Sequence, residues 1–234
     1  MRIRFKPWAR EELETSPFYI DNPKEYKNKW KTAFENNNEI RLELGCGKGN
    51  FVSQSSIENP NINYIAVDLI DAMLGMAKRN IEVAYGIRKS TDKEEIEDEI
   101  EKQKVVKNIK LIRYDISNIS EIIGPNDEIK RIYINFCNPW PKGKHYKKRL
   151  TFDRNLLAYK NFLKGEIYFK TDDDELFKAS LEYFENAGYE IISKTYDLHS
   201  ENNFWKDQNN VETEHEKMFT AEGIKIKALI AKPK

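Results

Sequence analysis

A glycine-rich stretch preceded by a carboxylate is the first feature of the sequence whose residue types could bind a charged ligand. In LELGCGKGNF (42–51), Glu43 stands before Gly45, Gly47 and Gly49. Glycine lets the backbone pass close to a ligand and adopt positive φ without steric penalty. The spacing is G-x-G-x-G rather than the G-x-G-x-x-G of a dinucleotide site. A carboxylate beside such a loop favours a cationic ligand over a pyrophosphate.

Two further acids stand at the ends of the next strand-like runs. Asp68 lies in YIAVDL (64–69), where a carboxylate can accept hydrogen bonds from two ribose hydroxyls. Asp115 follows IKLIRY (109–114), where it can receive an exocyclic amine. Together with Glu43 and the glycine loop, these acids resemble the S-adenosylmethionine site of class I methyltransferases. That ligand has an ammonium, a sulfonium, a ribose and an adenine but no phosphate. For the glycines alone, the alternative is a tight strand-to-helix turn.

A stiff corner followed by a run of cations is the second chemical motif. In FCNPWPKGKHYKKRL (136–150), prolines on both sides of Trp140 fix φ, and Pro139 holds Asn138 away from the helical region. Cations interleaved with aromatic rings suit phosphates and stacked bases, although a charge run alone is more often a solvated surface. The run comprises Lys142, Lys144, His145, Tyr146, Lys147, Lys148 and Arg149.

The elements that must position these residues alternate between strands and helices. Continuous apolar runs at 40–44, 64–69, 109–114, 131–136 and 166–171 are typical of strands covered on both faces. They predict a doubly wound α/β fold with a mostly parallel, Rossmann-like sheet, which places both motifs at one carboxyl edge. The segments 189–198 and 223–232 predict an antiparallel end to the sheet.

Length and composition predict a single domain spanning residues 1–234, with a basic N-terminal extension (1–38) and a charged helical insertion (86–107). In the insertion, Thr91 and Glu94 fit a capping box. The 39 basic and 39 acidic residues cancel, so a surface for a polyanion must be local. The sequence shows neither a signal peptide nor an apolar run of membrane-spanning length. Cys46 and Cys137 lack metal-site spacing. We therefore expect a cytoplasmic protein without a bound metal or membrane association.

The second motif resembles the F-x-D-P-W-P-K-x-R-H-x-K-R-R-L signature of bacterial tRNA (guanine-N7-)-methyltransferases, the TrmB family. The likeness extends over nearly the whole chain, from RIRFKPWA and NPKEYKNKW to FKTDDDELF (169–177) and VETEHEKMF (211–219). The resemblance implies a class I methyltransferase fold, S-adenosylmethionine as methyl donor and tRNA as partner. It also implies that the methyl group goes to N7 of the guanine at position 46, in the variable loop.

The resemblance also assigns roles to individual residues. It implies that Glu43, Asp68, Asp115 and Asn138 line the S-adenosylmethionine site, and that Asn138 is the catalytic position. It further implies substrate contacts from Lys142 and Asp172, an RNA-interaction segment from Lys144 to Arg149, and a guanosine pocket from Thr213, Glu214, His215 and Glu216. On sequence alone, Asp172 with Glu175 and Thr213 with Glu216 also fit helix N-caps.

Two positions depart from the family pattern. Asn138 stands where the family usually has Asp, and Lys144 stands where it usually has Arg. An amide cannot act as a general base, so an RNA-binding homologue without catalysis stays open as an alternative. Asn138-Pro139-Trp140 also resembles the Asn-Pro-Pro-aromatic motif of adenine-N6-type amino-methyltransferases, which stay open as a second alternative. The oligomeric state, monomer or homodimer, also stays open.

Overall fold

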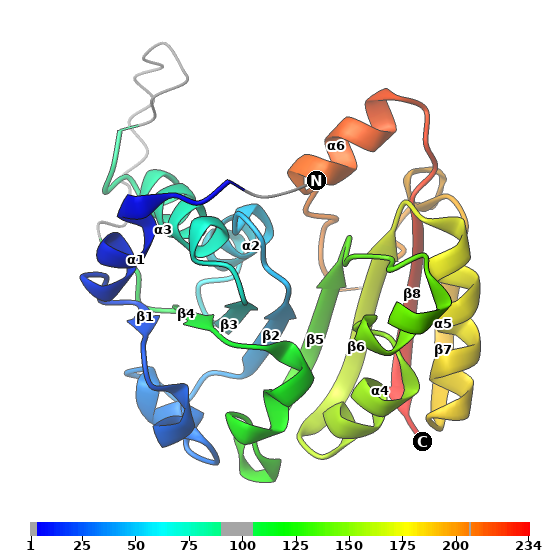
Figure 1. The fold of residues 1–234 in the computed structure, drawn as a ribbon, viewed down its shortest axis with the longest axis horizontal. Helices are drawn as coiled ribbons and strands as arrows, with labels where there is room; N and C mark the ends of the chain where they lie inside the picture. Colours follow the sequence, from blue (N-terminus) through cyan, green and yellow to red (C-terminus); the bar gives the residue numbers. More distant parts are fainter. Residues whose placement is uncertain (1–3, 90–104, 206) are drawn as a thin grey trace.

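One sheet collects strands from almost the full length of the chain (Figure 1). A computed structural model describes residues 4–89, 105–205 and 207–234. The strands are β1 (Tyr19–Ile20), β2 (Ile40–Leu44), β3 (Asn63–Asp68), β4 (Ile109–Arg113), β5 (Ile129–Asn135), β6 (Leu163–Thr171), β7 (Tyr189–Thr195) and β8 (Lys227–Pro233). The α-helices are α1 (Pro7–Glu14), α2 (Asn50–Glu58), α3 (Asp71–Ala84), α4 (Asp153–Lys160), α5 (Asp174–Asn186) and α6 (Glu214–Ala221).

The sheet is parallel except near its last edge. The strand order is β1-β4-β3-β2-β5-β6-β8-β7. β8 lies antiparallel to both β6 and β7, and the other neighbours pair in parallel. This confirms the predicted doubly wound α/β class and its antiparallel end. The segments predicted at 189–198 and 223–232 form shorter strands than expected, and β1 was not predicted.

Helix α6, between the last two strands, shows why the sequence indicated no crossover helix there. It has eight residues, and its buried residue is Glu216 rather than an apolar side chain. A helix without an apolar stripe has no periodic signal to read.

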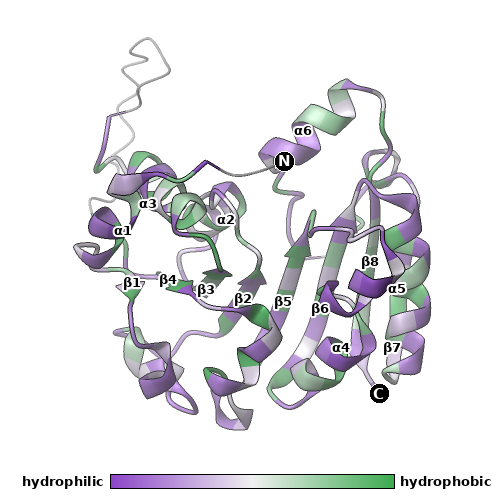
Figure 2. Cartoon of the chain, in the orientation of Figure 1, coloured by the Kyte–Doolittle hydropathy of each residue, from purple (hydrophilic) through white to green (hydrophobic). Residues whose placement is uncertain are grey.

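Two hydrophobic clusters cover the two faces of the sheet. The first cluster joins the sheet to α4 and α5, and the second joins it to α1, α2, α3 and the segment 198–211. Figure 2 shows the hydrophobic residues that run along the central strands. Side chains alternate along a strand, so Leu42 enters the first cluster while Glu43 points to the second face. Tyr168 packs in the second cluster, so Lys170, two residues further along β6, points to that face too.

The chain reverses its winding direction next to β2. From β2 it moves outward to β3 and β4, and it then returns to β5 on the other side of β2. In open α/β sheets, ligands bind outside the carboxyl ends of the strands at such a switch point. The glycine loop after β2 and the Asn-Pro-Trp-Pro corner after β5 therefore flank the expected ligand position.

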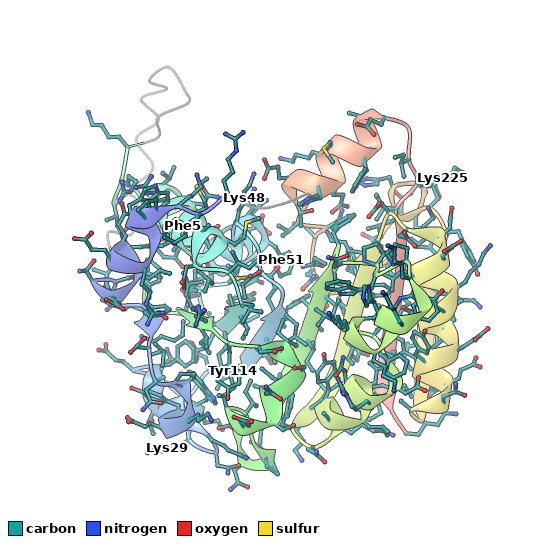
Figure 3. All side chains as sticks on the ribbon, in the orientation of Figure 1. Phe5, Lys29, Lys48, Phe51, Tyr114 and Lys225 are labelled. Atoms are coloured by element: carbon teal, nitrogen blue, oxygen red, sulfur yellow. The ribbon has the colours of Figure 1, made fainter. Side chains whose placement is uncertain are left out.

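The described part of the N-terminal extension packs against the domain. Helix α1 lies on α3, where the Arg79 guanidinium is 3.4 Å from the centre of the Trp8 ring. Trp30 is fully buried, and its indole N–H donates to the carbonyl of Ile122 at 2.7 Å. Lys29 lies at the edge of the molecule opposite Lys48 of the glycine loop (Figure 3). The capping box expected at Thr91 lies outside the described residues.

Candidate active site

The glycine loop connects β2 to α2 and is bound to β3. The N–H groups of Gly45 and Cys46 both donate to the carbonyl of Val67, at 2.8 and 3.0 Å. Gly49 caps α2 with φ of +71°, and a Cβ there would lie 2.7 Å from Cβ of Ala77. Only glycine combines this conformation with such close contact to α3. The loop is therefore held tightly under the edge of the sheet.

Asp68, the last residue of β3, closes the loop from the other side. Its Oδ2 accepts the N–H of Gly47 at 3.0 Å, and its Oδ1 accepts the N–H of Ile70 at 3.0 Å. Burial raises the pKa of this carboxyl, against the effect of these backbone donors. Each oxygen keeps a second lone pair. Asp68 can therefore organise the loop and still accept hydroxyl groups.

Glu43 is buried with one oxygen that has no hydrogen-bond partner among the described residues. The side chain of Asn135 donates to Oε1 at 3.2 Å, whereas Oε2 is unpaired. Burial raises the pKa of Glu43 to about 8. An unpaired buried carboxylate oxygen is costly, and a bound ammonium group would satisfy it.

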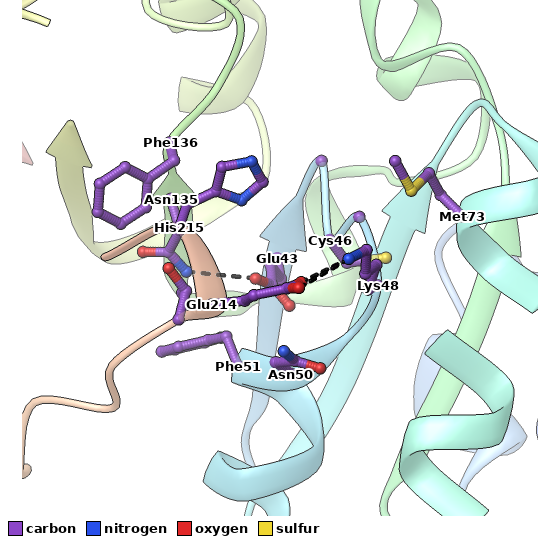
Figure 4. Close-up of a pocket in the computed structure, with 13 residues that line it drawn as sticks. Glu43, Cys46, Lys48, Asn50, Phe51, Met73, Asn135, Phe136, Glu214 and His215 are labelled. Carbon is purple, nitrogen blue, oxygen red and sulfur yellow. Dashed lines mark hydrogen bonds and ion pairs between the residues drawn. The ribbon is translucent and has the colours of Figure 1, made fainter. Parts of the chain in front are cut away.

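A pocket, here called the central pocket, opens between the glycine loop, the end of β5 and the start of α6 (Figure 4). Lys48 Nζ and Glu214 form an ion pair of 2.7 Å that joins its two sides. Residues 166 positions apart in the sequence thus meet at this pocket. The lining residues are Glu43, Gly45, Cys46, Gly47, Lys48, Asn50, Phe51, Met73, Asn135, Phe136, Thr213, Glu214 and His215.

Asp115 lies in a second, outer pocket next to β4. Its Oδ1 accepts the N–H and the hydroxyl of Ser117 at 2.9 and 2.8 Å. Leu69, the neighbour of Asp68, also lines this pocket. Glu43 in the central pocket, Asp68 between the pockets and Asp115 in the outer one suit an elongated ligand with a cationic end.

The corner after β5 holds two non-glycine residues in the left-handed region. Phe136 has φ of +50° and Trp140 has φ of +45°, which is rare for aromatic residues. Arg149 supports the corner, because its Nε donates to the carbonyl of Pro139 at 2.7 Å and its guanidinium lies 3.8 Å from the centre of the Tyr146 ring. Arg149 is 2% exposed. It therefore lies inside the corner, which departs from its expected place in an RNA-interaction surface.

Asn138 is exposed at the tip of the corner. Its Oδ1 faces the N–H of Trp140 at 3.4 Å, and it does not line the central pocket. Asn135, which the sequence analysis did not single out, lines that pocket and contacts Glu43. The available signal was a polar residue at the end of the strand, directly after the apolar run 132–134.

The cationic run forms a short 3-10 helix, Gly143–Lys148, on the surface beside the corner. Lys148 Nζ lies 4.8 Å from the centre of the Trp140 ring, and the His145 ring packs against Trp140 at 5.6 Å. This arrangement combines positive charge with an aromatic surface. Its exposed cations are Lys142, Lys144, Lys147 and Lys148, whereas His145 and Tyr146 are half-buried.

The predicted capping box at the start of α6 is confirmed. Thr213 Oγ1 accepts the N–H of Glu216 at 3.1 Å, and Glu216 accepts in return from Thr213 N. Glu214 and His215 line the central pocket together with Thr213. Glu216 is fully buried behind them and pairs with Lys170 at 2.5 Å. Its carboxylate therefore pairs with a partner inside the protein, whereas the resemblance implied that Glu216 contacts guanosine directly.

The predicted helix cap at Asp172 is wrong by one residue. Asp173 caps α5, because its Oδ1 accepts the N–H of Leu176 at 2.6 Å. Asp172 is half-buried just after β6, and its carbonyl accepts from Lys227 Nζ at 3.0 Å. Burial raises the pKa of Asp172. The Asp172 side chain does not cap α5, so this alternative to the substrate contact implied by the resemblance is removed.

The sheet order, the glycine loop and the acids at successive strand ends define a class I S-adenosylmethionine-dependent methyltransferase. A family described as "Putative methyltransferase" matches residues 37–229. A tRNA (guanine-N(7)-)-methyltransferase of Clostridium beijerinckii is 57% identical over 99% of this chain and 98% of its own. That of Acetivibrio thermocellus is 46% identical over the full length of both. The chain belongs to the tRNA (guanine-N7-)-methyltransferase family.

Solved structures of low sequence identity share the fold. "Structure of an Antibiotic Related Methyltransferase" aligns with a TM-score of 0.56 and 15% identity, over 91% of this chain and 94% of its own. A 16S rRNA (adenine(1408)-N(1))-methyltransferase from Catenulisporales acidiphilia aligns with a TM-score of 0.54 and 13% identity, over 91% of both chains.

Within the residues that the structure describes, no helix has the length and apolarity to cross a membrane. The same residues include no cluster of three or more His, Cys, Asp or Glu side chains arranged for a metal ion.

Proposed function

We propose that this protein transfers a methyl group from S-adenosylmethionine to N7 of guanine in tRNA, at position 46 of the variable loop. The observation that carries the proposal is the buried Oε2 of Glu43, which has no hydrogen-bond partner among the described residues and lies in a pocket whose opposite side is Thr213–His215. A tRNA substrate would place the reaction in the cytoplasm.

The donor would lie along the acids at the carboxyl edge. Its sulfonium supplies an electrophilic methyl group when bound. Glu43 would hold the ammonium, Asp68 the ribose hydroxyls and Asp115 the adenine amine. The absence of phosphate from this ligand agrees with a loop flanked by carboxylates, since anionic side chains would repel a pyrophosphate.

The acceptor chemistry does not require a general base. Guanine N7 attacks with an in-plane lone pair and carries no proton, so catalysis rests on the alignment of nucleophile, carbon and leaving sulfur. Asn138 would act as an orienting group, because an amide both accepts and donates hydrogen bonds. The strained corner, supported by Arg149, keeps Asn138 and Trp140 in place.

Binding of the tRNA backbone would fall to the exposed lysines of the cationic helix. Lys142, Lys144, Lys147 and Lys148 lie on one surface beside the corner. Lysine and arginine contacts to phosphates supply much of the sequence-independent affinity for nucleic acids. The base would then be selected in the central pocket rather than on this surface.

The test is incubation of the purified protein with methyl-labelled S-adenosylmethionine and an unmodified tRNA transcript, followed by nucleoside analysis. We expect label in 7-methylguanosine. Label in N6-methyladenosine would instead indicate an amino-methyltransferase, and tRNA binding without label would indicate an RNA-binding homologue.

The role of Asn138 has its own comparison. We expect Asn138→Ala to lower kcat by about 10- to 100-fold through misplacement of the reacting groups, while Asn138→Asp keeps a hydrogen-bond acceptor and loses less. Wild-type kcat in both variants would show that Asn138 does not orient the substrate.

A further inference from the structure

Lys170 contacts both segments that border the central pocket, namely the end of β5 and the segment that leads into α6. It lies near the end of β6 and is 2% exposed. Its Nζ donates to Glu216 Oε2 at 2.5 Å, to the carbonyl of Val211 at 2.8 Å and to Asn210 Oδ1 at 3.1 Å. An ammonium group has three donors, so this set uses all of them.

The backbone of the same residue supports the corner after β5. The N–H of Phe136 donates to the carbonyl of Lys170 at 2.9 Å. Lys170 Nζ also lies 5.9 Å from the centre of the Phe136 ring. One residue thus contacts both the segment that enters the Asn-Pro-Trp-Pro corner and the segment that enters α6.

Glu216 connects Lys170 to Thr213, which lines the central pocket. Asn210 Nδ2 donates to its Oε1 at 2.7 Å, and the N–H of Thr213 approaches its Oε2 at 3.4 Å. His199 Nε2 lies 3.2 Å from Oε1. Both oxygens are therefore occupied within the protein, and the direction of the first turn of α6 depends on this carboxylate.

The pair is poorly explained as a device for stability. Replacing a buried ion pair by apolar residues of similar volume is often neutral or stabilising, because the two charges lose their hydration. Buried polar networks instead fix one arrangement among several similar ones. In this protein the network around Lys170 and Glu216 fixes the position of Thr213, Glu214 and His215 relative to the glycine loop.

We propose that Lys170 is a positioning residue for methyl transfer, which acts through Glu216 and Asn210 to hold the Thr213–His215 side of the central pocket at the distance that the reacting base requires. This inference rests on the proposed function, since it concerns the acceptor side of the same site. Lys170 does not touch the reacting atoms in this scheme.

The decisive variant is the double substitution Lys170→Met/Glu216→Leu, which removes both charges together and leaves neither buried alone. We expect a folded protein that binds S-adenosylmethionine and tRNA within about 3-fold of wild type, because the acids of the donor site and the exposed lysines are intact. Its kcat for tRNA should fall by about 100-fold, the loss that a displacement of 1 Å can produce.

A matched control is Lys78→Met/Glu82→Leu. Lys78 and Glu82 form a buried ion pair of 2.5 Å within α3, and neither residue lines the central pocket. We expect this control to keep the wild-type kcat. A Lys170→Met/Glu216→Leu protein with kcat within 3-fold of wild type would show that the pair is merely structural and would overturn the proposal.

A second variant keeps the proposal testable if that double variant does not fold. Asn210→Ala removes one arm of the network and leaves the buried Lys170–Glu216 ion pair intact, and it should lower kcat by about 10-fold at unchanged tRNA affinity. An unchanged kcat would count against the proposal. Failure of the proposed function is distinguishable, because the wild-type protein would then place no label in 7-methylguanosine.

Discussion

Replacement of Glu43 by glutamine should change the pH dependence of stability in a direction that the structure sets. Burial raises the pKa of Glu43 from 4.5 to about 8 in the folded chain. Between these two pH values the folded protein binds one more proton than the unfolded protein. The contribution of this group to stability is therefore complete below pH 4.5 and is lost as the pH rises toward 8.

The magnitude follows from linkage. One proton of difference changes the free energy of unfolding by about 1.4 kcal/mol per pH unit. Glutamine carries no such proton, so the stability of Glu43→Gln relative to wild type should rise by about 2–3 kcal/mol between pH 5.5 and 7.5. Groups that do not interact with Glu43 contribute equally to both proteins and cancel in the difference.

Urea unfolding of both proteins at pH 5.5, 6.5 and 7.5 measures this difference. Glu58→Gln, an exposed position on α2, controls for the exchange of a carboxyl for an amide. A difference between Glu43→Gln and wild type that stays constant over this range would refute the reasoning.

Ligand binding provides a second measurement on the same residue. An ammonium group placed beside Glu43 favours its ionised form, so binding of S-adenosylmethionine at pH 6.5 should release close to one proton. Calorimetry in two buffers of different ionisation enthalpy counts that proton. Glu43→Gln should bind more weakly and release none.

Two further predictions concern the loop and the corner. Gly49→Ala should destabilise the protein by about 1–3 kcal/mol in urea unfolding, because the added Cβ would lie 2.7 Å from Cβ of Ala77 and the backbone has positive φ. An unchanged unfolding midpoint would show that α3 can move away. Lys144→Ala should lower the slope of log K against log salt for tRNA binding by about 1, because it removes one phosphate contact. Arg149→Lys should leave that slope unchanged and lower the stability, because the buried Arg149 donates to the carbonyl of Pro139. Equal slopes for the two variants would contradict this distinction.

The sequence predicted the sheet well because apolar runs and strand ends are local features. Glu43, Asp68 and Asp115 lie at the edge where parallel strands would bring them, since carboxyl ends of parallel strands share one side of a sheet. The cap at Thr213 was also readable, because a capping box is a four-residue pattern.

Burial of polar residues was not readable from local pattern. Charged residues are mostly exposed, and the family resemblance implied that Arg149 and Glu216 contact the substrate. Their burial depends on partners distant in sequence, Pro139 and Tyr146 for the arginine and Lys170 for the glutamate. Asn135 was missed for a related reason, because its contact with Glu43 crosses from β5 to β2.

The register between β5 and β6 links these distant contacts. Asn135 pairs with Lys170 across the two strands. Asn135 contacts Glu43 on the donor side of the pocket, and Lys170 contacts Glu216 on the acceptor side. A shift of β6 by one residue would turn Lys170 to the opposite face of the sheet and separate the two sides. In the proposed mechanism the sheet would therefore set the distance between the bound donor and the base, and the exposed lysines of 142–148 would hold the tRNA backbone.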